Sequence, residues 1–375
     1  YNNQLNENLS LNVGADARFY NGIHFRSVNE FLSLNSVSAS SEVHGDYEMT
    51  NAFGGINPWN VTFNTNDDHM QRFGYDYEEQ INYMGVFGQL EYSKDAFSAF
   101  LQGSVSTQSH VREGFYTLAG LGESEKITNG GFNAKAGAAY QINDENTVFV
   151  NAGYYSRQPY HDDLFTNIRT SNELNPFGEE NQKITGFEAG YKYAGEMFGA
   201  NLNLYYTTWD NRLLFGSDDI DDDNVSDVFY QSSPVKQVHM GAELEVFARP
   251  NDKLDLRGFV SVGDWKYDGN VTTSSYDDDN NLLSTGDPSY IDGVKVGNAA
   301  QFTAGISANY EVMPRFNLDA NWNQYDNLFG NINFGDDEFE TATNRGAIEL
   351  PSFDTVDAGL SYTMLLGKDD DKSLK

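Results

Sequence analysis

The side chains best suited to holding a ligand gather in long polar stretches of the chain. Tyr160, His161 and Asp162 are consecutive, while Tyr230 and Tyr276 stand close to runs of aspartate. Aromatic rings beside carboxylates can stack on sugars or grip a cationic ligand or a metal chelate. The alternative is that these acidic stretches are simply solvated. We predict substrate contacts from seven side chains: Trp59, Tyr116, Tyr160, His161, Asp162, Tyr230 and Tyr276.

Two groups of residues have part of the pattern of a metal site. Asp219, Asp221 and Asp223 have the spacing that opens a calcium-binding loop. The later glycine is missing, however, and Tyr230 stands where the glutamate at position 12 should be. A lone surface histidine such as His161 is more often unliganded than bound to a metal. We therefore expect no cofactor, and we keep the three aspartates only as alternative metal ligands.

Motifs for catalysis are missing from the sequence. It contains no HExxH, no GxSxG and no glycine loop that cradles phosphate before a lysine. The six histidines are scattered without the spacing of metal ligands. A serine, histidine and acid set could assemble across strands, but no local spacing indicates one. We expect that the protein is not an enzyme.

The elements that must position the candidate side chains are best defined by the stretch from Lys183 to Arg212. Apolar and polar residues alternate in it with a period of two, which predicts two strands, and Ala194 to Glu196 form the tight turn between them. Each arm is about as long as the 9 to 11 residues with which a tilted strand crosses a bilayer. One face is apolar and the other is polar and rich in glycine, as in a barrel wall between lipid and water.

The same alternation recurs along the chain and predicts about twelve strands. Short turns at Lys94, Asn143, Gly195, Asn251 and Pro314 alternate with long connections. Outer-membrane barrels have short periplasmic turns and long extracellular loops, whereas a soluble sandwich has no reason to place every long loop at one end. We predict an all-β, transmembrane antiparallel β-barrel with long extracellular loops at about 21–82, 112–130, 158–183, 212–235, 269–296 and 329–350.

Composition agrees with this prediction. The chain has 375 residues and a formal charge of -33, which argues against a nucleic-acid partner because phosphate is bound by lysine and arginine. A mean hydropathy of -0.57 and the absence of an apolar run of 18 residues argue against a transmembrane helix. A membrane barrel remains compatible, because only every second strand residue meets lipid. The 23 tyrosines and 26 phenylalanines suit the aromatic girdles of such a barrel.

Consecutive phrases across most of the chain resemble one family. They are LNVGADARFYNGIHFRSVNEFL (11–32), RFGYDYEEQINYMGVFGQLEYSKDAFSAFLQGS (72–104), VFVNAGYYSRQPYHDDLF (148–165), FEAGYKY (187–193), ANLNLYYTTWDNR (200–212), GAELEVFARPNDKLDLRGFVSVGDWKY (241–267) and DGVKVGNAAQFTAGISANYEVMPRFNLDANWNQYDNLF (292–329). Together they resemble the β-barrel of TonB-dependent outer-membrane receptors, in particular those of Bacteroidetes-type bacteria. No single one of these motifs would be specific enough alone.

This resemblance implies a barrel of about 22 strands with a plugged lumen. Residues 1–375 would then be a partial barrel, without the plug domain and the C-terminal strands. The implied function is import of a scarce substrate, such as a metal chelate or an oligosaccharide, across the bacterial outer membrane. The implied partners are the TonB complex, reached through the plug, outer-membrane lipid and lipopolysaccharide, and a surface lipoprotein that acts as a lid.

Three other functions fit parts of the same pattern. A complete twelve-stranded barrel could be an autotransporter translocator or a passive porin. A surface adhesin could use the acidic loops to bind divalent ions. A plug domain encoded upstream would favour the receptor, whereas a secreted passenger would favour the autotransporter.

Overall fold

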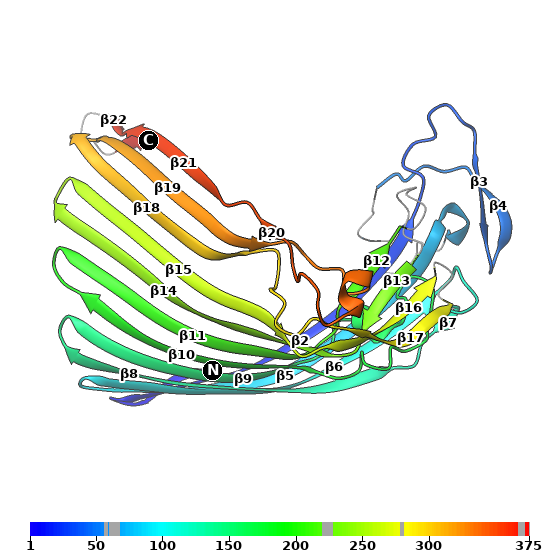
Figure 1. The fold of residues 1–375 in the computed structure, drawn as a ribbon, viewed down its shortest axis with the longest axis horizontal. Coiled ribbons are helices and arrows are strands. Elements are labelled where there is room, and N and C mark those ends of the chain that lie inside the picture. The colour runs from blue at the N-terminus through cyan, green and yellow to red at the C-terminus, as the bar shows by residue number, and fades with distance from the viewer. Residues whose placement is uncertain (56–58, 60–67, 220–227, 278–280, 367–371, 375) are drawn as a thin grey trace.

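The computed structural model describes the chain except for residues 56–58, 60–67, 220–227, 278–280, 367–371 and 375. Its main element is an antiparallel sheet of 15 strands (Figure 1). The long strands of this sheet are β2 (Leu9–Arg26), β5 (Phe73–Lys94), β6 (Phe97–Gly114), β8 (Ile127–Asn143), β9 (Asn146–Arg157), β10 (Gln182–Ala194), β11 (Phe198–Arg212), β14 (Val235–Asn251), β15 (Leu254–Asp268), β18 (Ala300–Met313), β19 (Phe316–Phe329) and β21 (Phe353–Tyr362).

These strands confirm the predicted all-β, antiparallel architecture with about twelve long strands. Neighbours in sequence are neighbours in the sheet, and short turns alternate with long connections along the whole strand order. Figure 1 shows the short turns at one end of a curved wall and the long loops gathered at the other. At the turn residues Asp95 and Arg315 the backbone is left-handed, with φ of 51° and 74°, as tight turns require.

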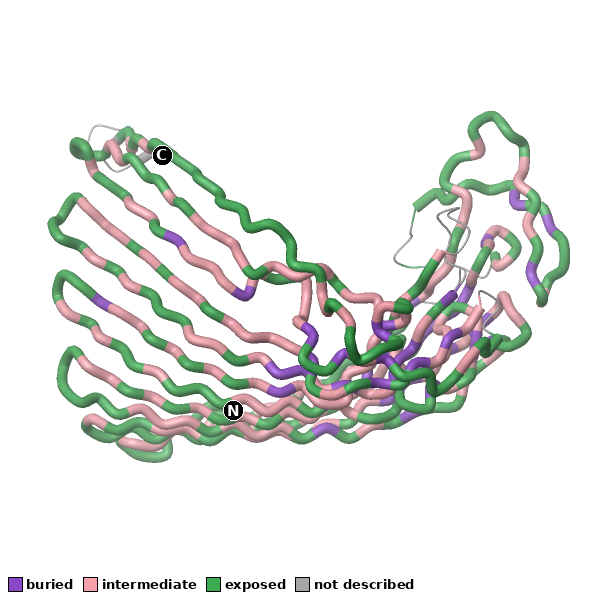
Figure 2. The backbone as a smooth tube through the Cα atoms, viewed as in Figure 1, coloured by how far each residue is buried: buried purple, intermediate pink, exposed green. Residues whose placement is uncertain are grey.

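The two faces of the wall differ in chemistry. The outer face carries large apolar side chains in register across strands: Phe187 lies opposite Tyr206, and Leu202 lies opposite Leu244. Side chains of this face stay exposed, Phe187 by 53% and Leu204 by 50%, and Figure 2 shows exposed residues recurring along the long strands. We name these rows the apolar belt; on β5 and β6 it spans 84–92 and 97–105. Such an exposed belt is what a wall facing lipid requires.

Phenylalanines on the opposite, inner face cover glycines of the neighbouring strand. In five places the two residues are direct cross-strand partners, and the ring occupies the space where a Cβ on the glycine would lie. An aromatic ring over a glycine pins the register of a curved sheet. The pairs are Gly14 with Phe87, Gly137 with Phe100, Gly190 with Phe149, Gly199 with Phe247 and Gly305 with Phe259.

Replacing Gly190 with alanine is expected to destabilise the wall. A Cβ at this position would lie 2.2 Å from the Phe149 ring and 2.7 Å from the Leu202 carbonyl oxygen. Overpacking of this kind costs roughly 1–3 kcal/mol. Gly186 is the matched control on the same strand and face, because a Cβ there meets only Thr207 Oγ1 at 3.6 Å. Urea unfolding of both variants in lipid vesicles tests the prediction; equal midpoints would contradict it.

The strands run further than the sequence pattern predicts. The first long connection was expected to span 21–82, but β2 continues to Arg26 and β5 begins at Phe73. The backbones of β2 and β5 continue to pair above the belt, where the side chains are polar. Gly22, for example, lies opposite Glu79 in the same ladder. The other long connections begin and end within a few residues of the expected positions.

The loop end contains small structures of its own. A four-stranded sheet combines β12 (Phe215–Asp218), β13 (Val228–Ser232), β16 (Val271–Asp277) and β17 (Leu282–Ser289). Residues from the ends of two wall strands and from the long loops pack together in one core, among them Val235, Tyr267, Ile291, Phe334 and Phe339. Other elements at this end are β3 (Val37–Ser41), β4 (Gly45–Met49) and β7 (Gly122–Glu123), and the 3-10 helices η1 (His69–Gln71), η2 (Asp162–Leu164) and η3 (Asp337–Glu340).

The sheet does not close on itself among the described residues. One edge is formed by β1 (Asn2–Asn6) and β2, and the other by β20 (Glu349–Leu350) and β21, which both pair with β19. A separate two-stranded ladder joins β22 (Met364–Leu366) to β23 (Lys372–Leu374). In the described part of the chain, no helix is long and apolar enough to cross a membrane.

Candidate functional site

A buried polar network lies on the inner face above the apolar belt, with Glu79 of β5 at its centre. Nε2 of His24 on β2 lies 3.2 Å from one Glu79 carboxylate oxygen, and Nε2 of His161 lies 3.7 Å from the other. Gly22 is the cross-strand partner of Glu79. A Cβ on Gly22 would lie 2.7 Å from the Tyr20 hydroxyl and 2.8 Å from His24 Nε2. The glycine therefore leaves the space in which these side chains converge.

Hydrogen bonds define the tautomers of two further histidine rings. The Gln108 amide donates to His110 Nε2 at 2.8 Å, so the His110 proton is on Nδ1. That Nδ1 lies 3.1 Å from Nδ1 of His161 and donates to it. The His161 proton is then on Nε2, the atom that faces Glu79. The chain of bonds therefore needs both histidines to be neutral.

Burial keeps these two histidines in that neutral form. His110 lies beyond the belt and His161 lies in the loop after β9, and both side chains are buried. Desolvation lowers the pKa of each imidazole to about 4, although the nearby Glu79 carboxylate acts in the opposite direction. The hydrogen bond between His110 and His161 thus holds the loop after β9, and protonation of His161 Nδ1 would break this bond.

This pair predicts that docking of the loop 158–181 depends on pH. With the loop docked, the pKa of each histidine lies below the value of about 6.5 that it has when exposed. Between pH 6.5 and 4 the protein therefore binds more protons when the loop is detached than when it is docked. Docking is therefore fully stable above pH 6.5 and weakens as the pH falls towards 4. Hydrogen exchange of residues 158–181, corrected for its intrinsic pH dependence, should accelerate over this window. An H110N/H161N variant should lose the dependence, and a flat wild-type profile would contradict the assignment.

Arg112 of β6 ties the same loop to the wall. Its side chain is 1% exposed and stacks on Tyr77, with the guanidinium carbon 5.1 Å from the ring centre. Burial lowers its pKa to about 10, so the group remains charged at neutral pH. The guanidinium donates four hydrogen bonds of 2.7 to 3.1 Å, to the carbonyl oxygens of Gly120, Ile168 and Arg169 and to Oδ1 of Asn172.

A buried ion pair anchors the end of the first long loop. Arg72 Nη1 pairs with Asp76, and the other oxygen of that carboxylate lies 2.6 Å from His69 Nδ1. The Tyr47 hydroxyl of β4 donates to the Arg72 carbonyl oxygen, which ties the β3–β4 hairpin to this corner. The His69 ring stacks on Phe115, with the ring centres 4.3 Å apart.

The four-stranded sheet places two of the predicted substrate residues on opposite faces. Tyr230 pairs with Ser275, whereas Tyr276 pairs with Phe229, one position along. Paired residues share a face and successive residues alternate, so the two tyrosines point in opposite directions. Tyr230 packs against the loop core, with its ring over Gly335. The two tyrosines therefore cannot clasp one ligand between them in this arrangement.

The other predicted residues lie in different surroundings. The Tyr116 hydroxyl donates to the Ser40 carbonyl oxygen at 2.6 Å, which links two loops. Tyr160 is exposed and stacks on Arg157, whose guanidinium carbon is 3.6 Å from the ring centre. Trp59 is 70% exposed. Asp162 begins the short helix η2, directly after the buried His161.

The structure gives no support for a metal centre in the part it describes. Among these residues, no group of three or more histidine, aspartate or glutamate side chains is arranged to hold a metal ion. Asp219 follows β12, and Asp221 and Asp223 lie outside the described residues. The His24, Glu79 and His161 cluster is a set of close polar contacts between two wall strands and the loop after β9.

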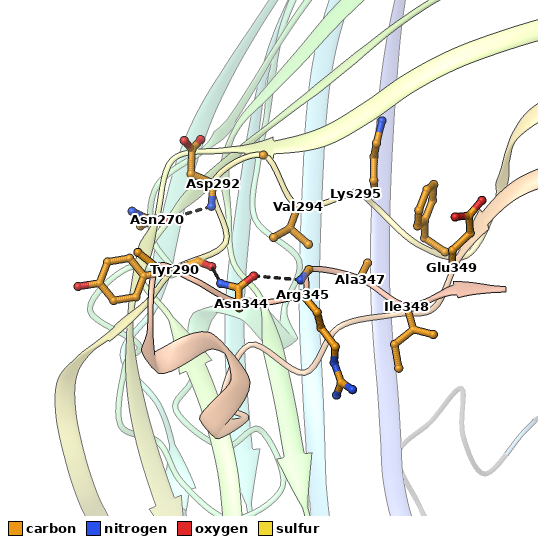
Figure 3. A pocket seen from close by; sticks show the side chains of 14 residues that line it. Asn270, Tyr290, Asp292, Val294, Lys295, Asn344, Arg345, Ala347, Ile348 and Glu349 are labelled. Atoms are coloured by element: carbon orange, nitrogen blue, oxygen red, sulfur yellow. Dashed lines mark hydrogen bonds between the residues drawn. The ribbon is translucent and has the colours of Figure 1, made fainter.

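A hollow of about 930 Å³ opens between two of the long loops (Figure 3). Its lining includes Asp292, Lys295, Arg345 and Glu349, so charges of both signs face it. Figure 3 shows the Lys295 and Arg345 side chains pointing in opposite directions. The Asn344 amide donates to the Tyr290 carbonyl oxygen at 2.8 Å and so holds the two loops together. Such a hollow suits a polar ligand that carries both donors and acceptors.

Sequence reasoning missed most of the polar network. The period-two pattern, continued past the belt, assigns His24 and His110 to the inner face. Each stands an even number of residues from inner-face residues of the same strand. That period-two signal is present in the sequence. The approach of His161 to Glu79 had no such signal, because it depends on the path of the loop after β9 across the mouth.

Comparisons with solved structures give the fold of the wall. The FrpB iron transporter from Neisseria meningitidis is 15% identical, with a TM-score of 0.54, and the match covers 96% of this chain and 46% of that one. The copper transporter OprC is 12% identical, with a TM-score of 0.58 and 95% and 47% covered. The ferric-catecholate import receptor Fiu from E. coli K12 is 13% identical, with a TM-score of 0.56 and 94% and 46% covered.

The chain thus spans about half the length of these structures. No curated protein matches the sequence. The likeness to solved structures is below 25% identity and shows the fold alone. The family model described as "TonB dependent receptor-like, beta-barrel" matches residues 1–371, and the chain belongs to this family of outer-membrane transport barrels.

Proposed function

We propose that this wall is about half of a plugged barrel of some 22 strands that imports a scarce substrate across the outer membrane. The substrate would bind at the loop end, and the TonB complex would drive its release by acting on a plug domain. The observation that carries this proposal is a wall with an exposed apolar outer face and a polar inner face in a chain of the receptor family.

The inner face is suited to a hydrated plug. Its polar side chains bond to one another across strands: Asn201 donates to Glu245 at 3.2 Å, and Asn151 donates to Glu188 at 3.3 Å. These bonds pair polar side chains of neighbouring strands with one another, and a hydrated plug can move past such a polar face. The strand edges at β2 and β21 would pair with the further strands of the complete barrel.

Substrate selection would lie in the loops. Tyr160, Asp162 and Trp59 are exposed there, and the polar hollow beside Lys295 and Arg345 adds a second surface. A metal chelate and an oligosaccharide both fit aromatic rings next to charged groups. FrpB, OprC and Fiu are described as iron, copper and ferric-catecholate transporters, which favours testing metal chelates first. A surface lipoprotein lid and an origin in Bacteroidetes-type bacteria also belong to this proposal.

Uptake by living cells tests the proposal. Cells that express the natural protein receive labelled ferric catecholate, ferric hydroxamate, copper(II) or an oligosaccharide mixture. We expect accumulation of one probe to rise above that of cells without the protein, and to stop when TonB is deleted or a protonophore is added. Accumulation that continues without TonB would contradict active import and indicate a passive porin.

A further inference from the structure

Two arginines stand on the inner face at the loop end of the wall. Arg157 ends β9 and lies an even number of residues from Phe149, which belongs to the inner face of the same strand. Arg212 ends β11, and its Nη1 donates to Oε1 of Gln237 at 2.9 Å. Gln237 has the phase of the inner-face Phe247 on β14. Only β10 separates β9 from β11 in the sheet, so the two guanidinium groups share one region of this face.

Aromatic rings hold both guanidinium groups in place. The guanidinium carbon of Arg157 is 3.6 Å from the centre of the Tyr160 ring, and that of Arg212 is 5.6 Å from the centre of the Trp209 ring. Stacking of this kind positions a cation without neutralising its charge. Gln237 is 3% exposed and holds Arg212 from a second side. Both cations are therefore positioned before a ligand arrives, which lowers the cost of binding one.

Both arginines have an unused donor. Arg157 Nε and Arg212 Nε are buried atoms without a hydrogen-bond partner in the part of the chain that the structure describes. A buried charged donor without an acceptor is costly, and such a group indicates a partner from outside the chain. The ion pairs that arginine forms with carboxylates in the described residues involve other side chains: Arg18, Arg72, Arg249 and Arg345.

One carboxyl group, that of Asp163, lies close enough for both arginines to act on it. Burial raises the pKa of this carboxyl above its ordinary value, although the charges of Arg157 and Arg212 act in the opposite direction. Glu180 is a further acid in this region, and it accepts a hydrogen bond from Asn211 at 2.9 Å. Two guanidinium groups thus act on one aspartate, so one of their positive charges remains even when Asp163 is ionised.

We propose that Arg157 and Arg212 bind an anionic group of the imported substrate, which makes the substrate an anionic metal chelate rather than a neutral oligosaccharide. The inference rests on the proposed function and names its substrate class. Carboxylate and catecholate oxygens both accept charge-assisted hydrogen bonds from guanidinium. Tyr160, 62% exposed and stacked on Arg157, gives the same ligand an aromatic surface.

The charge of the chain makes these two arginines decisive for such a ligand. A protein with 56 acidic and 23 basic residues repels anions over most of its surface. An anionic chelate is then held only where cations are fixed and are not fully neutralised by neighbouring acids. Loss of the two charges should therefore remove the preference for an anion, not merely weaken the binding of every ligand.

Equilibrium dialysis of the detergent-purified natural protein against four complexes of radiolabelled iron tests the proposal. A catecholate and a citrate complex are anionic, a cyclic hydroxamate complex is neutral, and a linear hydroxamate complex is cationic. We expect one of the anionic complexes to bind at least about tenfold more tightly than the neutral and cationic ones. The tighter of the two anions identifies the group bound as catecholate or carboxylate. Preference for the neutral or cationic complex, or binding of none of the four, would overturn the proposal.

Three variants assign the preference to the two arginines. R157Q/R212Q should bind the preferred anion at least about tenfold more weakly and should no longer distinguish it from the neutral complex. R257Q is the matched control, because Arg257 lies on the inner face opposite Phe247 but near the turn end, where β15 begins. D163N should bind the anion more tightly, because it removes a competing carboxylate. Weaker binding by D163N would show that the arginines serve Asp163, and this result would also overturn the proposal.

Uptake by living cells separates this inference from the proposed function. TonB-dependent accumulation by the wild type tests import, whereas the charge preference is measured on purified protein and does not depend on TonB. Accumulation of the preferred anion by R157Q/R212Q should fall at least about tenfold when the complex is supplied below its dissociation constant. Unchanged accumulation in this variant would overturn the arginine site and leave the import function standing.

Discussion

Replacing Leu204 with arginine is expected to prevent most of the protein from inserting into lipid vesicles. Leu204 is half exposed on the outer face, in register with Ala189 on one side and Ala242 on the other. A charged residue on the lipid face near the bilayer midplane costs about 2–4 kcal/mol. The folded fraction, measured from the heat-modifiable band on a gel and from urea titration, should fall accordingly.

The neighbouring residue supplies a matched control. Asn203 precedes Leu204 on the same strand but points to the inner face, where its amide donates to Glu243 at 3.4 Å. Arginine at position 203 would meet the carboxylates of Glu243 and Glu245 and should change stability by less than about 0.5 kcal/mol. If L204R folds as well as N203R, the assignment of the two faces is wrong.

Replacing Arg112 with methionine is expected to release the loop 158–181 from the wall. The substitution keeps an apolar side chain but removes the donor of four hydrogen bonds, of which one is buried and three are partly buried. Each acceptor left unpaired costs roughly 1–3 kcal/mol, so the docked loop should lose most of its stability. Hydrogen exchange in residues 158–181 should accelerate at least tenfold, while the barrel band on a gel stays intact.

Two further variants make this test specific. Lysine at position 112 cannot reproduce a planar fork that reaches acceptors on several residues, so R112K should restore protection only in part. Arg157 stands at the start of the same loop and stacks on the exposed Tyr160, so R157M should change exchange little. Full protection in R112M would show that the loop is held by the histidine network or by packing alone.

The wall could be predicted from the sequence because its signal is local and repeated. Alternation in stretches such as 198–206 defines both the strand and its outer face, and the structure confirms both. The strand ends could not be predicted in the same way. Above the belt, the residues of β2 and β5 are polar and no longer alternate with apolar ones. The backbones of the two strands nevertheless continue to pair, as far as Arg26 on β2 and Phe73 on β5.

The candidate site was harder to predict for a different reason. His161 was selected from its aromatic and acidic neighbours as a substrate residue, whereas the structure buries it against His110. Contacts between a loop and a distant strand depend on the path of the chain, which residue spacing does not encode. Tyr230 and Tyr276 show the same limit, because their opposite directions follow from the register between β13 and β16. The seven substrate residues stay predictions.

We propose that this wall surrounds a plug as part of a larger barrel. The most direct test is the intact mass of the protein in purified outer membranes, with peptide mapping and gels run with and without boiling. We expect a species of about twice the 41.9 kDa of this chain or more, with peptides from outside residues 1–375. A heat-modifiable species of 41.9 kDa would contradict the account, because it would be a complete small barrel with no room for a plug.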